Sequence, residues 1–388
     1  MAVGLALLAV ILWALPTPPV PTHGGRTARE WLVDLAGPDH ARKEPALAAF
    51  GAMGKTSIPL LARSLNDKNS AIEQLILWFK AQVPQMSSWV IAASERQSAA
   101  LDALERIGTV ATLPALIRLL QQPPNSSEAE EARRARAAEI IGALGSKATA
   151  ALPVLLDIVR ADAGRGSASG RAALAAVTEI GGHPAQIGPV LIECLRSGDE
   201  RMRRLAAAGI GDWGHQAAFA VEPLRVALWN PDAGAFTEVA TALGQVGAAA
   251  HAVAPDLIRG LKYESSMIRA VAALNLARVK PVPELAVPAL VVALKDEDTF
   301  VRSRAAWALG TFGAGAASAS GDLGRALHDE SEAVQISVIE ALGAIGPGAV
   351  EAVPDLERAR SNRQAGLGRH VLAALARIEH GADVSTPR

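Results

Sequence analysis

The sequence predicts an all-α fold, an α-solenoid in which about eleven antiparallel helix pairs form a right-handed superhelix. An apolar residue followed by glycine recurs along the chain, and from Gly181 onward it recurs at steps of 33 residues, six times in succession. A proline followed by an apolar stretch comes after most of these glycines at a fixed distance. Hydrophobic residues make up 50% of the chain and aromatic residues only 4%, which suits small, closely packed helices. A repeat of this length is typical of stacked helix pairs.

The second helix of each pair has the clearer pattern. Within residues 301–312 the apolar side chains fall at i, i+4, i+7, i+8 and i+11, which is one face of an α-helix. The glycine that follows suits a helix end, because a left-handed residue costs least without a Cβ atom. This landmark glycine occurs at Gly54, Gly108, Gly145, Gly181, Gly214, Gly247, Gly313 and Gly346, while Lys280 and Glu379 hold the same phase without it.

The first helix of each pair carries a proline near its start or middle. Proline removes a backbone hydrogen bond, so we expect it to bend this helix. It lies eight residues after the landmark at Pro153, Pro189, Pro255, Pro288 and Pro354, whereas Pro223 is one residue late and Gly321 replaces it once.

A basic residue recurs eleven residues before the landmark, at the start of the second helix. We interpret these residues as a structural ladder that ties each pair to neighbouring turn oxygens. Its members are Arg134, Arg203, Arg269 and Arg302, with Lys43 in the first pair. Acidic or amide residues six positions earlier, among them Asp296 and Asp329, lie in the turn and can cap the following helix.

Together these motifs resemble the HEAT repeat, in its short variety close to the repeats of bilin lyases. The resemblance extends over about residues 27–380. Asp296 and Arg302 match the pair of turn aspartate and helix arginine in that family, but Asp329 has Gln335 where the arginine would stand, which is a departure. The signatures of ankyrin and tetratricopeptide repeats are absent from the sequence. The resemblance implies a fold with an extended surface and names no activity.

The first repeats are less regular than the later ones. Thr27 and Glu30 form a capping box that opens the first helix of the array. Gly54 and Gly108 are 54 positions apart, which is too long for one repeat unit and too short for two of standard length. We interpret this stretch as two compressed units, with Pro84 opening the second pair.

The ends of the chain differ from the repeats. Ala2–Leu15 is an uncharged apolar run whose 14 residues would span about 21 Å as a helix, less than the hydrocarbon core of a bilayer. This length suits a signal peptide or a short anchor, with a buried first helix as the alternative. The expected organisation is therefore a signal or anchor segment at 1–15, a Pro-rich linker at 16–26, the solenoid at 27–380 and a disordered tail at 381–388. We expect a membrane-anchored or exported protein and leave the side of the membrane open.

No residue pattern predicts catalysis, a metal site or a cofactor. Cys194 is the only cysteine, and His183, His215 and His251 follow landmark glycines at different offsets, so they do not stack in register. Gly54-Lys55-Thr56 lacks the first glycine and the strand of a phosphate-binding loop. The formal net charge of -1 disfavours a nucleic-acid partner.

The exposed face of the second helices is the expected binding surface. Trp307 is the main candidate, because tryptophan is enriched at binding hot spots, and packing between second helices is its alternative role. The other candidates are Arg204, Thr241, Arg278 and Glu340. We expect a monomeric, non-catalytic scaffold that binds a protein or peptide. The alternatives are a lyase-like or ligand-holding accessory protein and a DNA-binding HEAT protein, which the charge disfavours.

Overall fold

The computed structural model describes residues 20–70, 73–74, 76–78, 91–123, 127–162, 164–229, 235–361 and 367–380. Within these ranges Thr22–His23 (β1) and Arg26–Thr27 (β2) form a short antiparallel hairpin, and the other elements are helices. The prediction of an all-helical array of antiparallel pairs is confirmed. The segment 1–15, the linker residues before Val20, Pro84 and the tail 381–388 lie outside the described residues.

The chain divides into two compact units. Unit 1 comprises residues 1–161 and 167–181, and unit 2 comprises residues 162–166 and 182–388. Ten helix pairs are complete within the described ranges; residues 54–107, where two compressed units were expected, contain one of these pairs and lie in part outside the described residues.

Unit 1 contains four of these pairs. Its first helices are α2 (Ala28–Ala36), α4 (Ile58–Ser64), α7 (Leu113–Leu120) and α9 (Leu152–Asp162). Its second helices are α3 (His40–Met53), α6 (Ala93–Ile107), α8 (Glu128–Ala143) and α10 (Ala168–Ile180). The capping box at Thr27 and Glu30 opens α2 as predicted.

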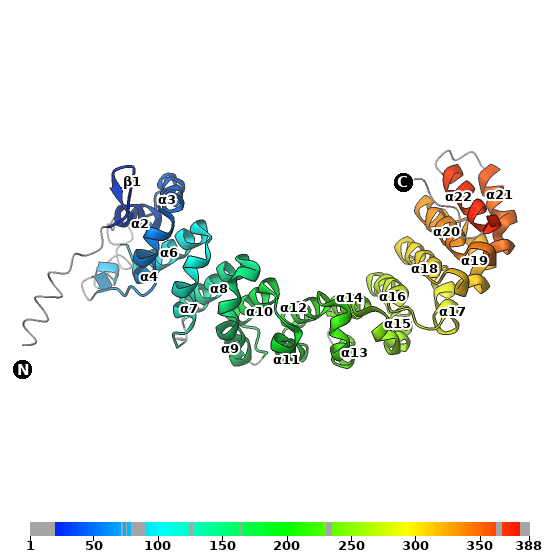
Figure 1. The fold of residues 1–388 in the computed structure, drawn as a ribbon, viewed down its shortest axis with the longest axis horizontal. Coiled ribbons are helices and arrows are strands. Elements are labelled where there is room, and N and C mark those ends of the chain that lie inside the picture. The colour runs from blue at the N-terminus through cyan, green and yellow to red at the C-terminus, as the bar shows by residue number, and fades with distance from the viewer. Residues whose placement is uncertain are drawn as a thin grey trace, which may run out of the picture. The chain divides into compact units, whose positions relative to one another are not determined.

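Unit 2 contains six pairs, whose second helices form one row and whose first helices form another (Figure 1). The first helices are α11 (Pro184–Cys194), α13 (Val221–Leu228), α15 (Ala254–Gly260), α17 (Pro283–Ala293), α19 (Ser320–Ala326) and α21 (Val353–Ser361). The second helices are α12 (Glu200–Gly211), α14 (Phe236–Val246), α16 (Ser266–Val279), α18 (Thr299–Thr311), α20 (Glu332–Ile345) and α22 (Leu367–His380).

The landmark glycines end the second helices as predicted. All eight have positive φ angles, between 53° and 73°, a region that a side chain makes costly. Lys280, which takes the place of the glycine after α16, also has a positive φ of 43°. Lys280 thus adopts the positive φ of this position without a glycine, but its ψ of 61° differs from the ψ of -140° at Gly247 and -139° at Gly346.

A bend was expected at the prolines, but in most pairs the chain instead changes from a 3₁₀ helix to an α-helix there. After most landmarks the chain forms a 3₁₀ segment, and an α-helix follows that has proline in its first turn except in α19 (Ser320–Ala326). These segments are η1 (Gly54–Ser57), η2 (Val110–Thr112), η3 (Gly145–Ala151), η4 (Gly214–Ala220), η6 (Gly247–Val253), η7 (Gly313–Ala319) and η8 (Gly346–Ala352). Proline in a first turn removes no helical hydrogen bond, so the expected loss does not occur at Pro255 or Pro354. Pro189 and Pro288 do lie inside helices, α11 and α17.

A second glycine, three residues before the landmark, lets neighbouring second helices come close. A Cβ atom added to Gly310 on α18 would lie 2.9 Å from the Cα of Ala341 on α20, and one on Gly343 would lie 3.1 Å from the Cα of Ala374. Gly211 and Gly244 hold the same position on α12 and α14. We refer to this line of close contact as the glycine seam.

One described stretch, Glu332–Arg360, has the length and the mean hydropathy, 1.5, of a membrane-spanning helix. It comprises α20, η8 and α21, which are parts of two successive pairs, and half of it is buried. Gly346 interrupts it with a φ of 69°. These properties are those of core helices in the stack.

Gly310→Ala tests the glycine seam. We expect the substitution to lower the free energy of unfolding by about 1–2 kcal/mol, because the new methyl group overlaps the α20 backbone and the gain in helix propensity offsets only part of that cost. Urea unfolding followed by circular dichroism measures the change. Gly368→Ala on α22 is the matched control: nothing lies within 4 Å of its added Cβ, so this variant should be unchanged or slightly more stable. Equal effects at both sites would contradict the seam.

Candidate functional site

The predicted binding residues all lie on the second helices of unit 2. Thr241, Trp307 and Glu340 hold one repeat position, six residues before the landmark, on α14, α18 and α20. Arg278 lies in the last turn of α16, and Arg204 lies near the start of α12. The Trp307 side chain is 39% exposed, so its ring is not enclosed by the neighbouring helices. The repeat therefore brings these residues to one face of unit 2.

Two of these residues already have partners. The Arg204 guanidinium binds Glu238 on α14 with nitrogen–oxygen distances of 2.6 and 2.7 Å, and it lies 3.7 Å from Glu200. Glu340 lies 3.6 Å from the Nδ1 atom of His370 on α22. Arg204 was expected to be free for a partner, but the structure uses it to join neighbouring second helices.

Two members of the arginine ladder, Arg269 and Arg302, join their helix pair to the next one. Arg269 donates from Nε and Nη2 to the two carboxylate oxygens of Asp296, both at 2.8 Å. Arg302 binds Asp329 in the same two-pronged way, at 2.7 and 2.9 Å. Within its own repeat Arg302 binds the backbone carbonyl of Asp296, at 3.0 Å, rather than the Asp296 carboxylate. The carboxylate partner of each arginine comes from the following repeat.

Other side chains at the ladder position donate a hydrogen bond to a backbone carbonyl of the turn that precedes their helix. Arg203 donates to Ser197 O at 2.7 Å and Arg134 to Gln122 O at 2.7 Å. Gln335 donates to Asp329 O at 2.6 Å. A glutamine can therefore replace the arginine at this position, because its amide still satisfies the turn carbonyl.

The ladder changes the acidity of its carboxylates. Burial opposes ionisation of Asp329, but hydrogen bonds from Arg302 and from the Ser331 N–H outweigh it and hold the pKa of Asp329 below its ordinary value of 3.8. The hydrogen bond to Asp329 in turn raises the pKa of Arg302. This ion pair is thus fully charged at neutral pH.

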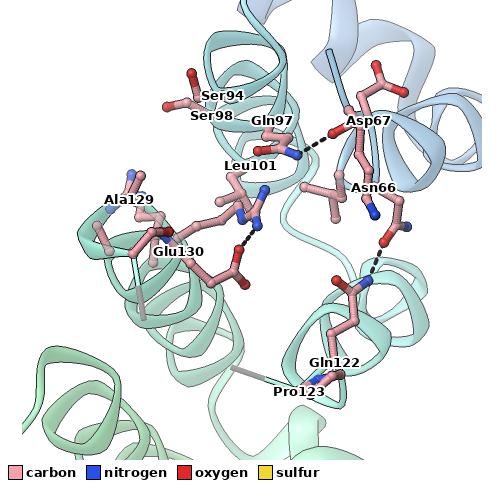
Figure 2. Close-up of a pocket in the computed structure, with 16 residues that line it drawn as sticks. Asn66, Asp67, Ser94, Gln97, Ser98, Leu101, Gln122, Pro123, Ala129 and Glu130 are labelled. Atoms are coloured by element: carbon pink, nitrogen blue, oxygen red, sulfur yellow. Dashed lines mark hydrogen bonds and ion pairs between the residues drawn. The ribbon is translucent and has the colours of Figure 1, made fainter. Parts of the chain in front are cut away.

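Unit 1 contains a cavity of about 880 Å³ between α6, α8 and the turns after α4 and α7. Figure 2 shows its walls, where Gln97 donates to Asp67 O at 2.6 Å and Gln122 binds Asn66. Glu130, 5% exposed, forms an ion pair with Arg133. The sequence did not indicate this cavity. Bonds within the wall thus occupy Gln97, Gln122 and Glu130.

The described residues bring no reactive set together. Burial raises the pKa of the Cys194 thiol to about 12, so it remains protonated and is a poor nucleophile. His183 caps α11 by accepting from the Ala185 N–H at 3.2 Å, and His251 lies 3.0 Å from Ala248 O. No group of three metal-binding side chains occurs in the described ranges.

Comparison with known proteins identifies the repeat. Residues 188–277, 254–323 and 287–377 match the model of HEAT repeats, and residues 97–122 match that of the PBS lyase HEAT-like repeat. This chain is a HEAT-repeat protein. Among curated proteins, no sequence matches this HEAT-repeat protein.

Solved structures share its fold. An engineered protein of known crystal structure is similar over 91% of this chain and 99% of its own, with 21% identity and a TM-score of 0.53. Importin beta is similar over 90% of this chain, with 16% identity and a TM-score of 0.57, and the match spans 50% of the importin beta chain. At these identities the likeness shows the HEAT-type solenoid fold alone.

Asp329→Asn tests the ladder and its pH dependence. At neutral pH we expect the free energy of unfolding to fall by about 2–3 kcal/mol, because Arg302 loses its charged partner. The pKa of Asp329 is lower in the folded state than in the unfolded state, so its contribution is complete above the ordinary value of 3.8 and is lost as the pH falls through the folded-state pKa. In urea unfolding, the difference between the two proteins should therefore shrink below about pH 4.

Glu357→Gln is the control for this experiment. Glu357 forms a surface ion pair with Arg360 at 3.3 Å, and both side chains are about half exposed. We expect this variant to change the free energy of unfolding by less than about 0.5 kcal/mol at each pH. A stability loss in Asp329→Asn that stayed constant down to about pH 2 would contradict the proposed titration.

Proposed function

We propose that this HEAT-repeat protein is a non-catalytic scaffold that binds another protein through the second-helix face of unit 2. The exposed ring of Trp307 on that face is the observation that carries the proposal. Large aromatic side chains contribute strongly when a partner covers them, because they bury much apolar surface with few rotatable bonds. Stacked helix pairs supply the extended surface that such binding needs.

Two features of the chain support binding over catalysis. The only cysteine is buried, and the histidines His183 and His251 contact nearby backbone atoms rather than one another. The formal net charge of -1 also supports a protein partner over nucleic acid. The cavity in unit 1 is the place where the alternative, a ligand-holding accessory protein, would carry its ligand.

Trp307→Ala tests the scaffold proposal. The tagged full-length protein is cross-linked in its host cells and purified, and its main bound partner is quantified by mass spectrometry. We expect the variant to recover at least about tenfold less of that partner, because a hot-spot ring is lost. Arg204→Glu should also weaken capture; because it removes the ion pair with Glu238, circular dichroism checks that this variant is still folded.

Phe219→Ala is the matched control for Trp307→Ala. Phe219 is an aromatic residue with 49% exposure in η4, among the first helices. Its loss should leave capture unchanged. Equal recovery of the partner by Trp307→Ala and by the unaltered protein, with both folded, would contradict the proposed surface.

We also propose that the N-terminal segment attaches this protein to a membrane or directs its export. The uncharged run Ala2–Leu15 and the prolines that follow it support the proposal.

Carbonate extraction of host membranes should leave the full-length protein in the membrane pellet if the segment is an anchor. If it is a cleaved signal, a mature chain lacking it should be recovered outside the cytoplasm. Deletion of residues 2–15 should leave the protein in the cytoplasm in either case. An intact full-length chain released into the soluble cytoplasmic fraction would contradict both forms of the proposal.

A further inference from the structure

Two neighbouring repeats of unit 2 expose large apolar side chains at matching positions. Met267 on α16 is 55% exposed, and Phe300, 33 positions later on α18, is 47% exposed. Trp307 follows Phe300 by two helical turns, and half-buried Leu274 holds the matching position on α16. The corresponding residues are Arg201 and Ala208 in α12, and Ala333 and Glu340 in α20. The apolar patch, defined by Met267, Leu274, Phe300 and Trp307, is thus specific to two repeats.

A row of glutamates borders the apolar patch. Glu264, Glu297 and Glu330 recur at steps of 33 in the turns that precede α16, α18 and α20. The side chains of Glu297 and Glu330 are 87% and 85% exposed, and Glu264 is also exposed. Since packed helices lie about 8–10 Å apart, successive carboxylates of this glutamate row are separated by about that distance.

The ladder arginines do not neutralise the glutamate row. Arg269 makes its two short bonds with Asp296 and only one longer contact, at 3.3 Å, with Glu297. Arg302 does the same with Asp329 and, at 3.5 Å, with Glu330. Each guanidinium therefore faces two carboxylates, so each of these turns retains an excess negative charge at the exposed glutamate.

The charges around the patch favour a basic partner. Cations are attracted both by the carboxylate row and by the faces of exposed aromatic rings. The Phe300 ring already shows this preference, because the Arg304 guanidinium lies 4.6 Å from its centre. An acidic partner would meet Arg304 at the Phe300 ring and Arg278 in the last turn of α16, without a repeating row of cations.

We propose that the apolar patch and the glutamate row together dock a basic segment of a partner protein. Apolar side chains of the segment cover Phe300 and Trp307, while its Lys or Arg side chains reach the glutamates. A polyproline II segment advances about 3.1 Å per residue with three residues per turn, so cations at every third residue lie on one side, about 9 Å apart, and match the spacing of the row. This inference rests on the proposed scaffold function and specifies the chemistry of its partner.

A synthetic peptide tests the proposal. The probe is a fluorescein-labelled 12-residue peptide of four Lys-Leu-Ala repeats, titrated with the full-length protein at low salt and followed by fluorescence anisotropy. Glu297→Gln combined with Glu330→Gln should weaken binding about tenfold, and Phe300→Ala should weaken it by a similar factor. Added salt should weaken binding to the unaltered protein more than to the double glutamine variant, because exposed charges are screened.

Glu284→Gln is the matched control, since Glu284 is exposed in the first turn of α17, among the first helices. It should bind the peptide as the unaltered protein does, and circular dichroism should show every variant folded. Three results would each overturn the inference: no binding of the lysine peptide, equal binding by the double variant, or tighter binding of a peptide with Glu in place of Lys. If the lysine peptide fails but Trp307→Ala still loses the native partner, the scaffold proposal stands and only the basic partner is excluded.

Discussion

The close packing of one second helix against the next is the constraint on which the rest of the repeat depends. A single helix pair cannot cover its apolar stripe, so each pair relies on its neighbours for burial. Gly310 and Gly343 allow that approach because a side chain at either position would meet the backbone of the next helix.

The turns must satisfy their polar groups within this tight stack. The arginine ladder does so in two directions, because Arg269 and Arg302 each donate to carbonyls of their own turn and to the aspartate of the next. The same side chain therefore closes a turn and fixes the register between neighbours. Glu297 takes part only weakly, since most of its carboxylate faces solvent.

The repeat period, the glycine helix ends and the common face of Trp307 and Thr241 could be predicted from the sequence, because each depends on local spacing along one helix pair. The partner of Arg302 could not be predicted in this way. Asp296 lies six positions away and Asp329 lies 27 positions away, and only the stacking of repeats brings the more distant residue into reach. The link between Arg204 and Glu238, and the cavity in unit 1, likewise depend on how neighbouring pairs pack.

The arginine ladder is interrupted at α20, where Gln335 holds the arginine position. At Gln335 an uncharged carboxamide takes the arginine position and binds the Asp329 carbonyl, so it cannot form an ion pair with any group that follows. The helices α21 and α22 are therefore held to the array by apolar contact and ordinary hydrogen bonds at this position. Local opening should therefore be easier at this junction than at the junctions that the ion pairs of Arg269 and Arg302 hold. The carboxy-terminal pair would then fray and exchange its amide hydrogens sooner than the ion-paired repeats before it.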